Sequence, residues 1–384
     1  LAEAAAVLGD AAGRGDAVAF LGGGTELGLG YAPSRVDVLV KTAHLCRVVE
    51  YAPADMVVEV EAGITLAAMQ RALAPHGQRL ALDAPYPELA TIGGLVATNA
   101  FGPRRLRFGT FRDLIVGVSM IRADGERVRG GGKVVKNVAG FDLPKLAVGS
   151  LGTLGMIATA TFRLHPVPEV ARAIRVGACG ADGLVALTRA TIANRLEPAA
   201  FVATRDAASG TYEAHVLFEG FDAGVAEQIA RFATIAEAQG LTSEPLGDGE
   251  RPGALDEAAR THGDVRVRIT VPPGDFVAFE RDALAPLANV LGDARAIVYP
   301  PLGIAFVSGY ATGVPATIAA LQGARRAVEA LHGNLVLTDV REPALGDAVD
   351  PYGTVPPSFF LMQRLKERFD PARRLNPGRF LGGL

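Results

Sequence analysis

The stretch that decides the fold is Phe20-Leu21-Gly22-Gly23-Gly24-Thr25, in which an apolar segment runs directly into three glycines and a threonine. A second glycine turn, Thr91-Ile92-Gly93-Gly94, follows later in the chain. Because glycine has no Cβ, its main chain can approach a ligand closely and direct its N–H groups at an anion. We therefore predict that the two turns, with the hydroxyl groups of Thr25 and Thr91, hold an anionic pyrophosphate between them.

Glycine is more frequent in this chain than in average proteins, with 46 of 384 residues against roughly 27 expected at about 7%. The excess excludes a coiled coil or a helical bundle as the main architecture, because glycine is costly inside helices. Half of the glycines, 23, lie in the first 160 residues, mostly in the clusters 22–30, 93–109, 130–140 and 149–155. One glycine pair alone is most simply a tight turn, but four clusters in order favour ligand contact through the main chain.

Neither of the two familiar nucleotide-binding glycine motifs matches the first turn. A Rossmann fingerprint requires G-x-G-x-x-G at the start of a helix. Here Gly22, Gly24 and Gly28 have the spacing G-x-G-x-x-x-G, and the sequel Tyr31-Ala32-Pro33 does not start a helix. A Walker loop requires G-x-x-x-x-G-K-[ST], and no segment of the sequence has this pattern.

Composition and charge exclude several other classes of protein. The length predicts two to three domains, and a hydrophobic fraction of 49% is sufficient for a packed core. A formal net charge of −3 gives no reason to expect nucleic acid as a partner. The two cysteines, Cys46 and Cys179, exclude a disulfide framework and a zinc or iron–sulfur site of ordinary spacing, so we predict no metal site and a reducing compartment.

The pattern of apolar residues divides the chain into three parts, 1–166, 167–345 and 346–384. Residues 84–110 are expected to contain little regular structure because they are rich in Gly, Pro, Thr and Asn. The uncharged run Leu146–Phe162 has 17 residues and three glycines, so we interpret it as a helix end, a turn and a strand rather than a membrane span. Alternating elements predict an α+β or α/β second domain, with strands near 173–176, 199–203, 213–218, 266–271, 304–308 and 334–338 and helices near 181–193, 222–239, 276–288 and 314–331.

Further segments, taken together with the first glycine turn, resemble a known family. They are Thr91–Ala100, Gly102-Pro103-Arg104, Phe108-Gly109 with Arg112-Asp113, Lys136–Leu143, Gly149–Ile157, Phe369-Asp370-Pro371 and Asn376-Pro377-Gly378. The set resembles the PCMH-type FAD-binding domain of the vanillyl-alcohol-oxidase-like FAD-linked oxidases, and within that superfamily the FAD-binding E subunits of bacterial glycolate oxidases. The resemblance is dense over residues 1–166 and looser in the middle of the chain.

The resemblance implies an α+β fold: a two-subdomain PCMH-type FAD-binding domain, an α/β (ferredoxin-like) cap domain, and a C-terminal segment that returns to the flavin. It also implies FAD held without a covalent bond, because some relatives attach FAD through a histidine near the first glycine turn and no histidine lies between residues 1 and 43. Glu26 stands where the subunit family often has a lysine, and we expect its side chain to point away from the pyrophosphate.

The resemblance assigns the cofactor contacts residue by residue. The first turn would wrap the pyrophosphate and the second would line its opposite side, while Asn99, Gly102 and Gly109 would approach the flavin ring or ribityl chain. The loop 152–157 would pass the adenine side, and Asn376 would bring the C-terminus towards the isoalloxazine. The complete set is Gly22, Gly23, Gly24, Thr25, Thr91, Gly93, Gly94, Asn99, Gly102, Gly109, Gly152, Thr153, Gly155, Ile157 and Asn376.

Catalytic groups are not identifiable from the sequence. The catalytic D subunits of glycolate oxidases and related D-lactate dehydrogenases share an H-x-G-D-G-N motif, of which this chain has only the fragments His262-Gly263-Asp264 and His332-Gly333-Asn334. Oxidation of a 2-hydroxy acid needs a base and a cation for the carboxylate. Arg268, which an alternating strand would place on the same side as Arg266, is one candidate cation, although a solvated strand face is the simpler interpretation. Arg104, Arg105 and Arg107 are alternatives for that role or for contact with the FAD phosphates.

The resemblance and the missing histidine motif together predict an FAD-binding subunit of a glycolate oxidase-type 2-hydroxy-acid dehydrogenase complex. Its partners would be a catalytic FAD-linked D-type subunit and an iron–sulfur subunit, its substrate a small 2-hydroxy acid, and its location the cytoplasm, in contact with the membrane only through partners. Two alternatives stay open: a self-sufficient FAD-dependent dehydrogenase with an unrecognised base, and a non-catalytic assembly subunit.

Overall fold

The computed structural model describes residues 1–132, 141–247 and 262–384. They form two compact units. The first unit comprises Leu1–Phe101, Phe108–Val167 and Thr354–Leu384, and we call it the flavin unit after the cofactor expected from the sequence. The second unit comprises Gly102–Arg107 and Pro168–Gly353.

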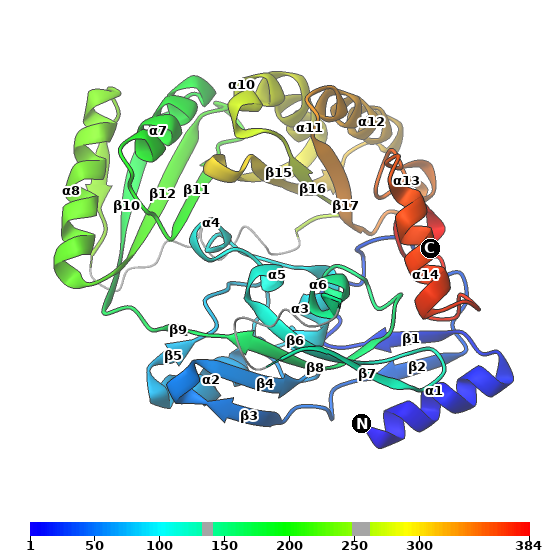
Figure 1. Ribbon diagram of the computed structural model, residues 1–384. Coiled ribbons are helices and arrows are strands. Elements are labelled where there is room, and N and C mark those ends of the chain that lie inside the picture. Colours follow the sequence, from blue (N-terminus) through cyan, green and yellow to red (C-terminus); the bar gives the residue numbers. More distant parts are fainter. Residues whose placement is uncertain (133–140, 248–261) are drawn as a thin grey trace. The chain divides into compact units, whose positions relative to one another are not determined.

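The flavin unit begins with helix α1 (Ala2–Arg14) and a small parallel sheet (Figure 1). The sheet pairs β1 (Val18–Leu21) with β2 (Val38–Lys41), so that Val18 lies opposite Val38. Strand β1 is half buried and ends at Leu21, directly before the first glycine turn. The predicted apolar strand therefore leads into that turn.

The larger sheet of the flavin unit is five-stranded and antiparallel, in the order β3-β4-β8-β6-β7. Helix α2 (Leu66–Leu73) packs against it, and Thr65 caps this helix by accepting a hydrogen bond from the Ala68 amide. The strands are β3 (Val48–Ala52), β4 (Val57–Glu61), β8 (Met156–Arg163), β6 (Ile115–Ile121) and β7 (Arg127–Gly131), with the separate pair β5 (Gln78–Arg79) and β9 (His165–Pro166).

The expectation of little regular structure over 84–110 is wrong in part. Helix α3 (Ile92–Thr98) contains both Gly93 and Gly94, and α4 (Arg105–Phe108) follows it. Glycine has a low intrinsic helix propensity. Here the amides of Ile92 and Gly93 donate to the carbonyl groups of Ile64 and Ala62, so tertiary contacts fix the first turn.

Further short helices complete the flavin unit: α5 (Phe111–Leu114), α6 (Leu143–Ala147) and the C-terminal α14 (Phe359–Phe369). The uncharged run from Leu146 contains the end of α6, a turn and strand β8, as predicted. Across the described ranges, no helix combines the length and the apolarity needed to cross a membrane.

An ion pair between the buried Glu61 and the exposed Arg47 makes the stability of this unit depend on pH. The Glu61 side chain is 1% exposed and accepts hydrogen bonds from the main-chain amide and the guanidinium of Arg47. These bonds lower the pKa of Glu61 below its usual value of 4.5. Because the pKa is lower in the folded than in the unfolded chain, the pair stabilises the fold above about pH 4.5, and this contribution is lost as the pH falls through the folded-state pKa.

The variant Glu61→Gln tests this contribution. At neutral pH we expect it to lower the free energy of unfolding by about 1 kcal/mol, a modest value because the Arg47 side chain is exposed to solvent. Chemical denaturation at about pH 6 and at about pH 3 should show the difference between wild type and variant shrinking towards zero at the lower pH. A difference that stays constant over this range would contradict the assignment.

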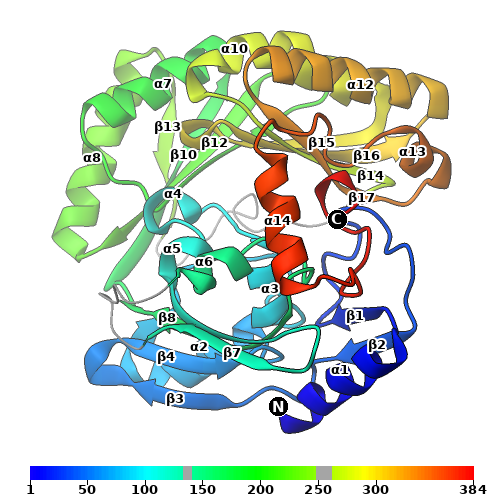
Figure 2. The same cartoon turned by 45° about the vertical axis from the view of Figure 1, so that its right-hand side comes forward.

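The second unit is an eight-stranded sheet with its helices on one face (Figure 1 and Figure 2). Its strand order is β13-β10-β12-β11-β15-β16-β14-β17, and every strand pair is antiparallel. The chain therefore follows two consecutive βαββαβ units, each of the ferredoxin-like kind, joined through β11 and β15. The antiparallel pairing decides between the two predicted classes in favour of α+β.

The first half of this sheet comprises β10 (Val170–Cys179), α7 (Ala181–Ala193), β11 (Ala200–Arg205), β12 (Tyr212–Gly220), α8 (Asp222–Ala238) and β13 (Ser243–Pro245). The second half comprises β14 (Val265–Thr270), α10 (Phe276–Phe279), a π-helical turn (Glu280–Leu284), α11 (Ala285–Val290), β15 (Leu291–Tyr299), β16 (Ile304–Ala311), α12 (Val314–Ala330) and β17 (Asn334–Val340). Helix α13 (Pro343–Ala348) follows the sheet.

Strand β15 was not among the predicted strands. Its start, Leu291-Gly292-Asp293-Ala294-Arg295, lacks apolar alternation, and the pairing register with β16 shifts between Gly292 and Arg295. Asp293 has a positive φ of 46° there. A bulge of this kind interrupts the alternation of apolar and polar residues from which a strand is predicted.

Candidate functional site

The two glycine turns lie directly against each other. A Cβ on Gly22 would lie 2.2 Å from Oγ1 of Thr91, and a Cβ on Gly23 would lie 1.8 Å from the carbonyl oxygen of Leu89. Real Cβ contacts are not this short, so only glycine allows the approach. The sequence prediction that these two segments come together is therefore met by the main-chain geometry.

The second turn is held to strand β4 by its own glycine. A Cβ on Gly93 would lie 2.7 Å from the Cβ of Ala62, so this glycine lets α3 pack onto the residue that follows β4. Thr91 caps α3 by accepting a hydrogen bond from the Gly94 amide, at 3.3 Å. The role of Gly93 here is close packing, and it does not line the cavity described next.

A small cavity of about 80 Å³ lies between the turns, and we call it the glycine cavity. Seven of the predicted cofactor residues line it: Gly22, Gly23, Gly24, Thr25, Thr91, Gly94 and Asn376. The other lining residues are Phe20, Leu21, Glu26, Leu27, Ala97, Thr98, Leu151 and Arg379. Glu26, whose carboxylate was expected to point away from a pyrophosphate, is thus at the cavity.

Main-chain amides of the first turn are available to a ligand. Within the described part of the chain, the amides of Gly22, Gly23, Gly24 and Thr25 donate to no protein acceptor. Gly24 has a φ of +71°, a left-handed conformation that suits glycine. Successive N–H groups in such a turn form an anion-binding concavity, and this arrangement fits a pyrophosphate.

The C-terminal segment contributes one wall of the glycine cavity. Leu375 forms a parallel bridge with Val18, and the Asn376 amide donates to the Val18 carbonyl at 2.8 Å. The side-chain amide of Asn376 donates to the Leu151 carbonyl at 2.6 Å. Gly152 permits this contact, because a Cβ there would lie 2.6 Å from the Asn376 side-chain nitrogen.

Two asparagine side chains in this unit carry buried oxygens without a partner. Among the described residues, Oδ1 of Asn376 and Oδ1 of Asn99 are buried and accept no hydrogen bond. Both residues also adopt a positive φ, of 42° and 50° respectively. A buried acceptor without a donor is costly. Both oxygens therefore suit a ligand that brings hydroxyl or N–H donors, as the ribityl chain and flavin ring of FAD do.

A buried lysine ties the C-terminal segment to the loop after α6. The Nζ atom of Lys366, on α14, donates to the carbonyl oxygens of Thr153 and Leu375 at 2.8 and 2.9 Å and to the Asp370 carboxylate at 2.7 Å. The Lys366 side chain is 2% exposed and that of Asp370 is fully buried. Burial lowers the pKa of Lys366, and the Asp370 charge opposes this shift. We call this pair the tail clasp.

The remaining predicted residues lie outside the glycine cavity. Thr153 is buried and donates to the Ser150 carbonyl, Gly155 approaches the Ile121 carbonyl, and Ile157 lies in β8. Gly109 has a φ of +77° beside the Thr110–Asp113 capping box. Gly102 belongs to the second unit. The cofactor contacts assigned to these residues stay predictions, and the motif positions 136–140 lie outside the described residues.

Arginines considered for substrate or phosphate contact have other partners. Nε of Arg104 donates to the buried Glu219 carboxylate at 2.8 Å, and Arg107 donates to the Glu219 main-chain carbonyl at 2.7 Å. The candidate Arg268 lies in β14 with intermediate burial, opposite Phe306 of β16. Arg266, on the same strand, is 4% exposed, with its guanidinium 5.4 Å from the centre of the Phe306 ring. These contacts are structural, so an interpretation of Arg104 or Arg107 as a carboxylate clamp is not favoured.

Three of the histidines lie in structural surroundings. His215 lies in β12 and is 8% exposed, and burial lowers its pKa. His76 and His165 pack edge-on against Tyr51 and Phe108. No group of three His, Cys, Asp or Glu residues in the described ranges is placed to hold a metal ion.

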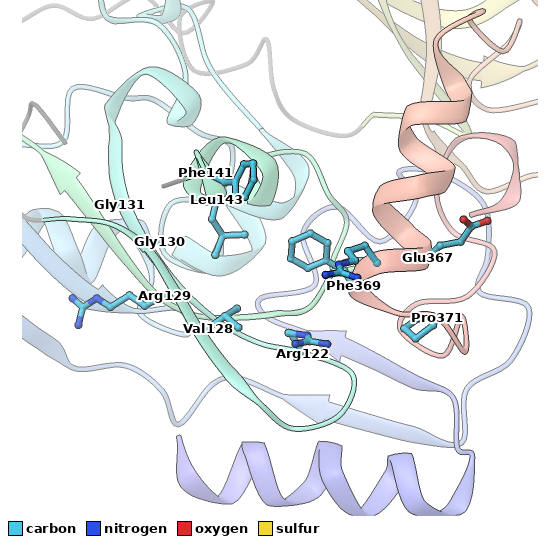
Figure 3. Close-up of a pocket in the computed structure, with 11 residues that line it drawn as sticks. Arg122, Val128, Arg129, Gly130, Gly131, Phe141, Leu143, Glu367, Phe369 and Pro371 are labelled. Atoms are coloured by element: carbon cyan, nitrogen blue, oxygen red, sulfur yellow. The ribbon is translucent and has the colours of Figure 1, made fainter. Parts of the chain in front are cut away.

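A larger cavity of about 830 Å³ lies elsewhere in the flavin unit. Figure 3 shows it between Phe141 and Leu143 on one side and Phe369 and Pro371, at the end of α14, on the other. It contains none of the predicted cofactor residues. Two of its arginines are engaged in ion pairs, Arg129 with Glu59 at 2.8 Å and Arg122 with Glu126 at 2.6 Å. The larger volume therefore does not make it the better candidate for an anionic cofactor.

Comparison with known proteins identifies the class to which this site belongs. The model of the FAD binding domain family matches residues 1–131. An alkyldihydroxyacetonephosphate synthase of known structure shares the fold, with a TM-score of 0.70 and 14% identity over 97% of this chain and 74% of that one. The predicted α+β fold with an FAD-binding domain is thereby confirmed.

Two curated proteins similar to this chain are subunits of glycolate oxidases. Glycolate oxidase subunit GlcE of Escherichia coli (strain K12) is 40% identical over 129 residues, which are 33% of this chain and 37% of that protein. Glycolate oxidase subunit GlcD of Bacillus subtilis (strain 168) is 34% identical over 153 residues, 40% of this chain and 33% of that protein. The chain thus matches about a third of the length of these relatives.

Fold, site and comparisons together define residues 1–131 as an FAD-binding domain. FAD is the cofactor of this domain. The resemblance drawn from the glycine turns and the C-terminal motif is confirmed at this level.

Two groups at the site were missed by the sequence reasoning. Arg379 lines the glycine cavity, and the tail clasp holds its C-terminal wall. Arg379 directly follows the Asn376-Pro377-Gly378 motif, so its position next to a recognised segment was a usable signal. The lysine of the clasp offered no comparable signal.

Proposed function

We propose that the chain is the FAD-binding subunit of a glycolate oxidase-type 2-hydroxy-acid dehydrogenase complex and holds FAD without a covalent bond. The observation that carries this proposal is the glycine cavity, with its row of available amides, in a chain that is 40% identical to a GlcE subunit over 129 residues. When bound, FAD would accept the hydride, and with it two electrons, that is removed from a substrate.

The residues of this chain would bind and orient the cofactor. The amides of Gly22–Thr25 would hold the pyrophosphate, and the partnerless oxygens of Asn99 and Asn376 would accept hydrogen bonds from the ribityl chain or flavin ring. No residue is assigned as a general base. A catalytic FAD-linked D-type subunit and an iron–sulfur subunit are the proposed partners, and a small 2-hydroxy acid is the proposed substrate, with the complex at the inner face of the membrane through those partners.

An absorption spectrum of the purified chain tests the proposal. We expect flavin bands that persist after addition of glycolate or D-lactate without oxygen, because the chain alone lacks a recognisable base. Acid precipitation should release the flavin into the supernatant if it is bound noncovalently. Bleaching by glycolate with this chain alone would favour a self-sufficient dehydrogenase, and absence of flavin that FAD cannot restore would favour an assembly subunit.

A further inference from the structure

The glycine cavity contains one cation and one acid among its lining residues, Arg379 and Glu26. A pyrophosphate diester brings two negative charges, and a carboxylate at the same cavity adds a third. Main-chain amides are neutral and offset anionic charge only partly through their dipoles. The charges at the cavity thus favour a role for the cation in binding the cofactor.

Arg379 is fixed at the cavity by contacts on both sides. Its Nη2 donates to the main-chain carbonyls of Glu26 and Leu27, at 3.3 and 3.1 Å. Its own amide donates to the Asn376 carbonyl at 3.2 Å, and its carbonyl accepts from the Tyr31 amide at 3.1 Å. The side chain is therefore held against the segment that directly follows the first glycine turn.

A guanidinium suits this position for chemical reasons. It is permanently charged and carries five N–H donors in a planar fork. Its contacts to the Glu26 and Leu27 carbonyls leave the positive charge in place, and this charge acts on a phosphate oxygen at the same cavity. Hydrogen bonds between a charged donor and a phosphate are among the stronger ones in proteins.

We propose that Arg379 is a cofactor-binding residue that supplies the positive charge for the FAD pyrophosphate and offsets Glu26. This inference rests on the proposed position of FAD in the glycine cavity. It places the charged phosphate contact on Arg379, whereas the sequence offered Arg104, Arg105 and Arg107 for that role. The C-terminal segment then contributes both Asn376 and the counter-charge.

Titration of the flavin-stripped protein with FAD and with riboflavin tests the role of Arg379, because riboflavin has no pyrophosphate. We expect Arg379→Gln to raise the Kd for FAD about 10- to 100-fold, the range for a lost hydrogen bond to a charged group. The Kd for riboflavin should change by less than about twofold. Arg379→Lys, which keeps the charge, should restore most of the FAD affinity, and Glu26→Gln should tighten FAD binding by roughly threefold.

Several outcomes would overturn the inference. Equal weakening of FAD and riboflavin by Arg379→Gln would mean that the arginine only positions the loop, and unchanged FAD affinity would mean that it has no role. If the variant does not fold, the salt dependence of the wild type decides: FAD affinity should fall with ionic strength while riboflavin affinity does not. If the wild type binds FAD tightly and Arg379→Gln leaves the Kd for FAD unchanged, only this inference is refuted. If the wild type binds neither flavin, the proposed site is refuted.

Discussion

Replacing Gly23 with valine is expected to raise the Kd for FAD at least about 30-fold. The new Cβ would lie 1.8 Å from the Leu89 carbonyl oxygen, so the two glycine turns must separate. Their separation moves the amides of the first turn away from the position that both turns define together. Overpacking of this kind also lowers the free energy of unfolding by about 1–3 kcal/mol. Flavin fluorescence titration measures the first effect and chemical denaturation the second.

Two further glycine variants make this a graded series. At Gly24 a Cβ would meet only the Leu21 and Leu27 side chains at 3.7 Å, so Gly24→Ala suffers chiefly from its φ of +71°. That strain is roughly 1–2 kcal/mol, and we expect it to weaken FAD less than Gly23→Val does. Gly13→Ala in α1 is the matched control, because a Cβ there meets nothing within 4 Å, and it should leave FAD affinity unchanged. If Gly23→Val binds FAD with the wild-type Kd, the proposed role of the two glycine turns in FAD binding is contradicted.

Lys366→Met is expected to lower the free energy of unfolding by about 3–5 kcal/mol, because it leaves the buried Asp370 charge without its cation. The variant also removes the donor to the Thr153 and Leu375 carbonyls. Since Leu375 precedes Asn376, we expect the C-terminal wall of the glycine cavity to loosen and FAD affinity to fall as well. Chemical denaturation of the flavin-stripped protein separates the stability effect from the loss of cofactor.

Two controls define what the tail clasp contributes. Lys145 pairs with Asp142 at 2.8 Å, but both side chains are about half exposed, so Lys145→Met should change the free energy of unfolding by less than about 1 kcal/mol. The double variant Lys366→Met with Asp370→Leu removes both charges and should be more stable than Lys366→Met alone. If the free energy of unfolding of Lys366→Met lies within about 1 kcal/mol of the wild-type value, the stabilising role of the tail clasp is refuted.

The parts of the fold that could be predicted from the sequence are those whose cause is local. The Thr65 cap of α2 depends on residues three apart, and the apolar strand before Gly22 is visible in a single window. Helix α3 and strand β15 could not be predicted in this way. Contacts of the Ile92 and Gly93 amides with residues before α2 override glycine propensity in α3, and the bulge at Gly292 hides the alternation of β15.

The site shows the same division between local and distant causes. The glycine turns were found because a need for close main-chain approach restricts the residue type at each position. Lys366 and Asp370 are spaced i, i+4, which in sequence is typical of an exposed helical pair, and only burial against Thr153 and Leu375 gives them their role. Arg379 likewise acquires its significance from the carbonyls of Glu26 and Leu27, which are distant in sequence.

In the protein with its cofactor bound, the two glycine turns are expected to hold the pyrophosphate of FAD. A crystal structure of the protein with FAD bound is the most direct measurement of this claim. We expect both phosphates within hydrogen-bonding distance of the amides of Gly22–Thr25, on the side lined by Thr91 and Asn376. Phosphates located instead in the larger cavity, beside Arg122 and Arg129, would contradict it.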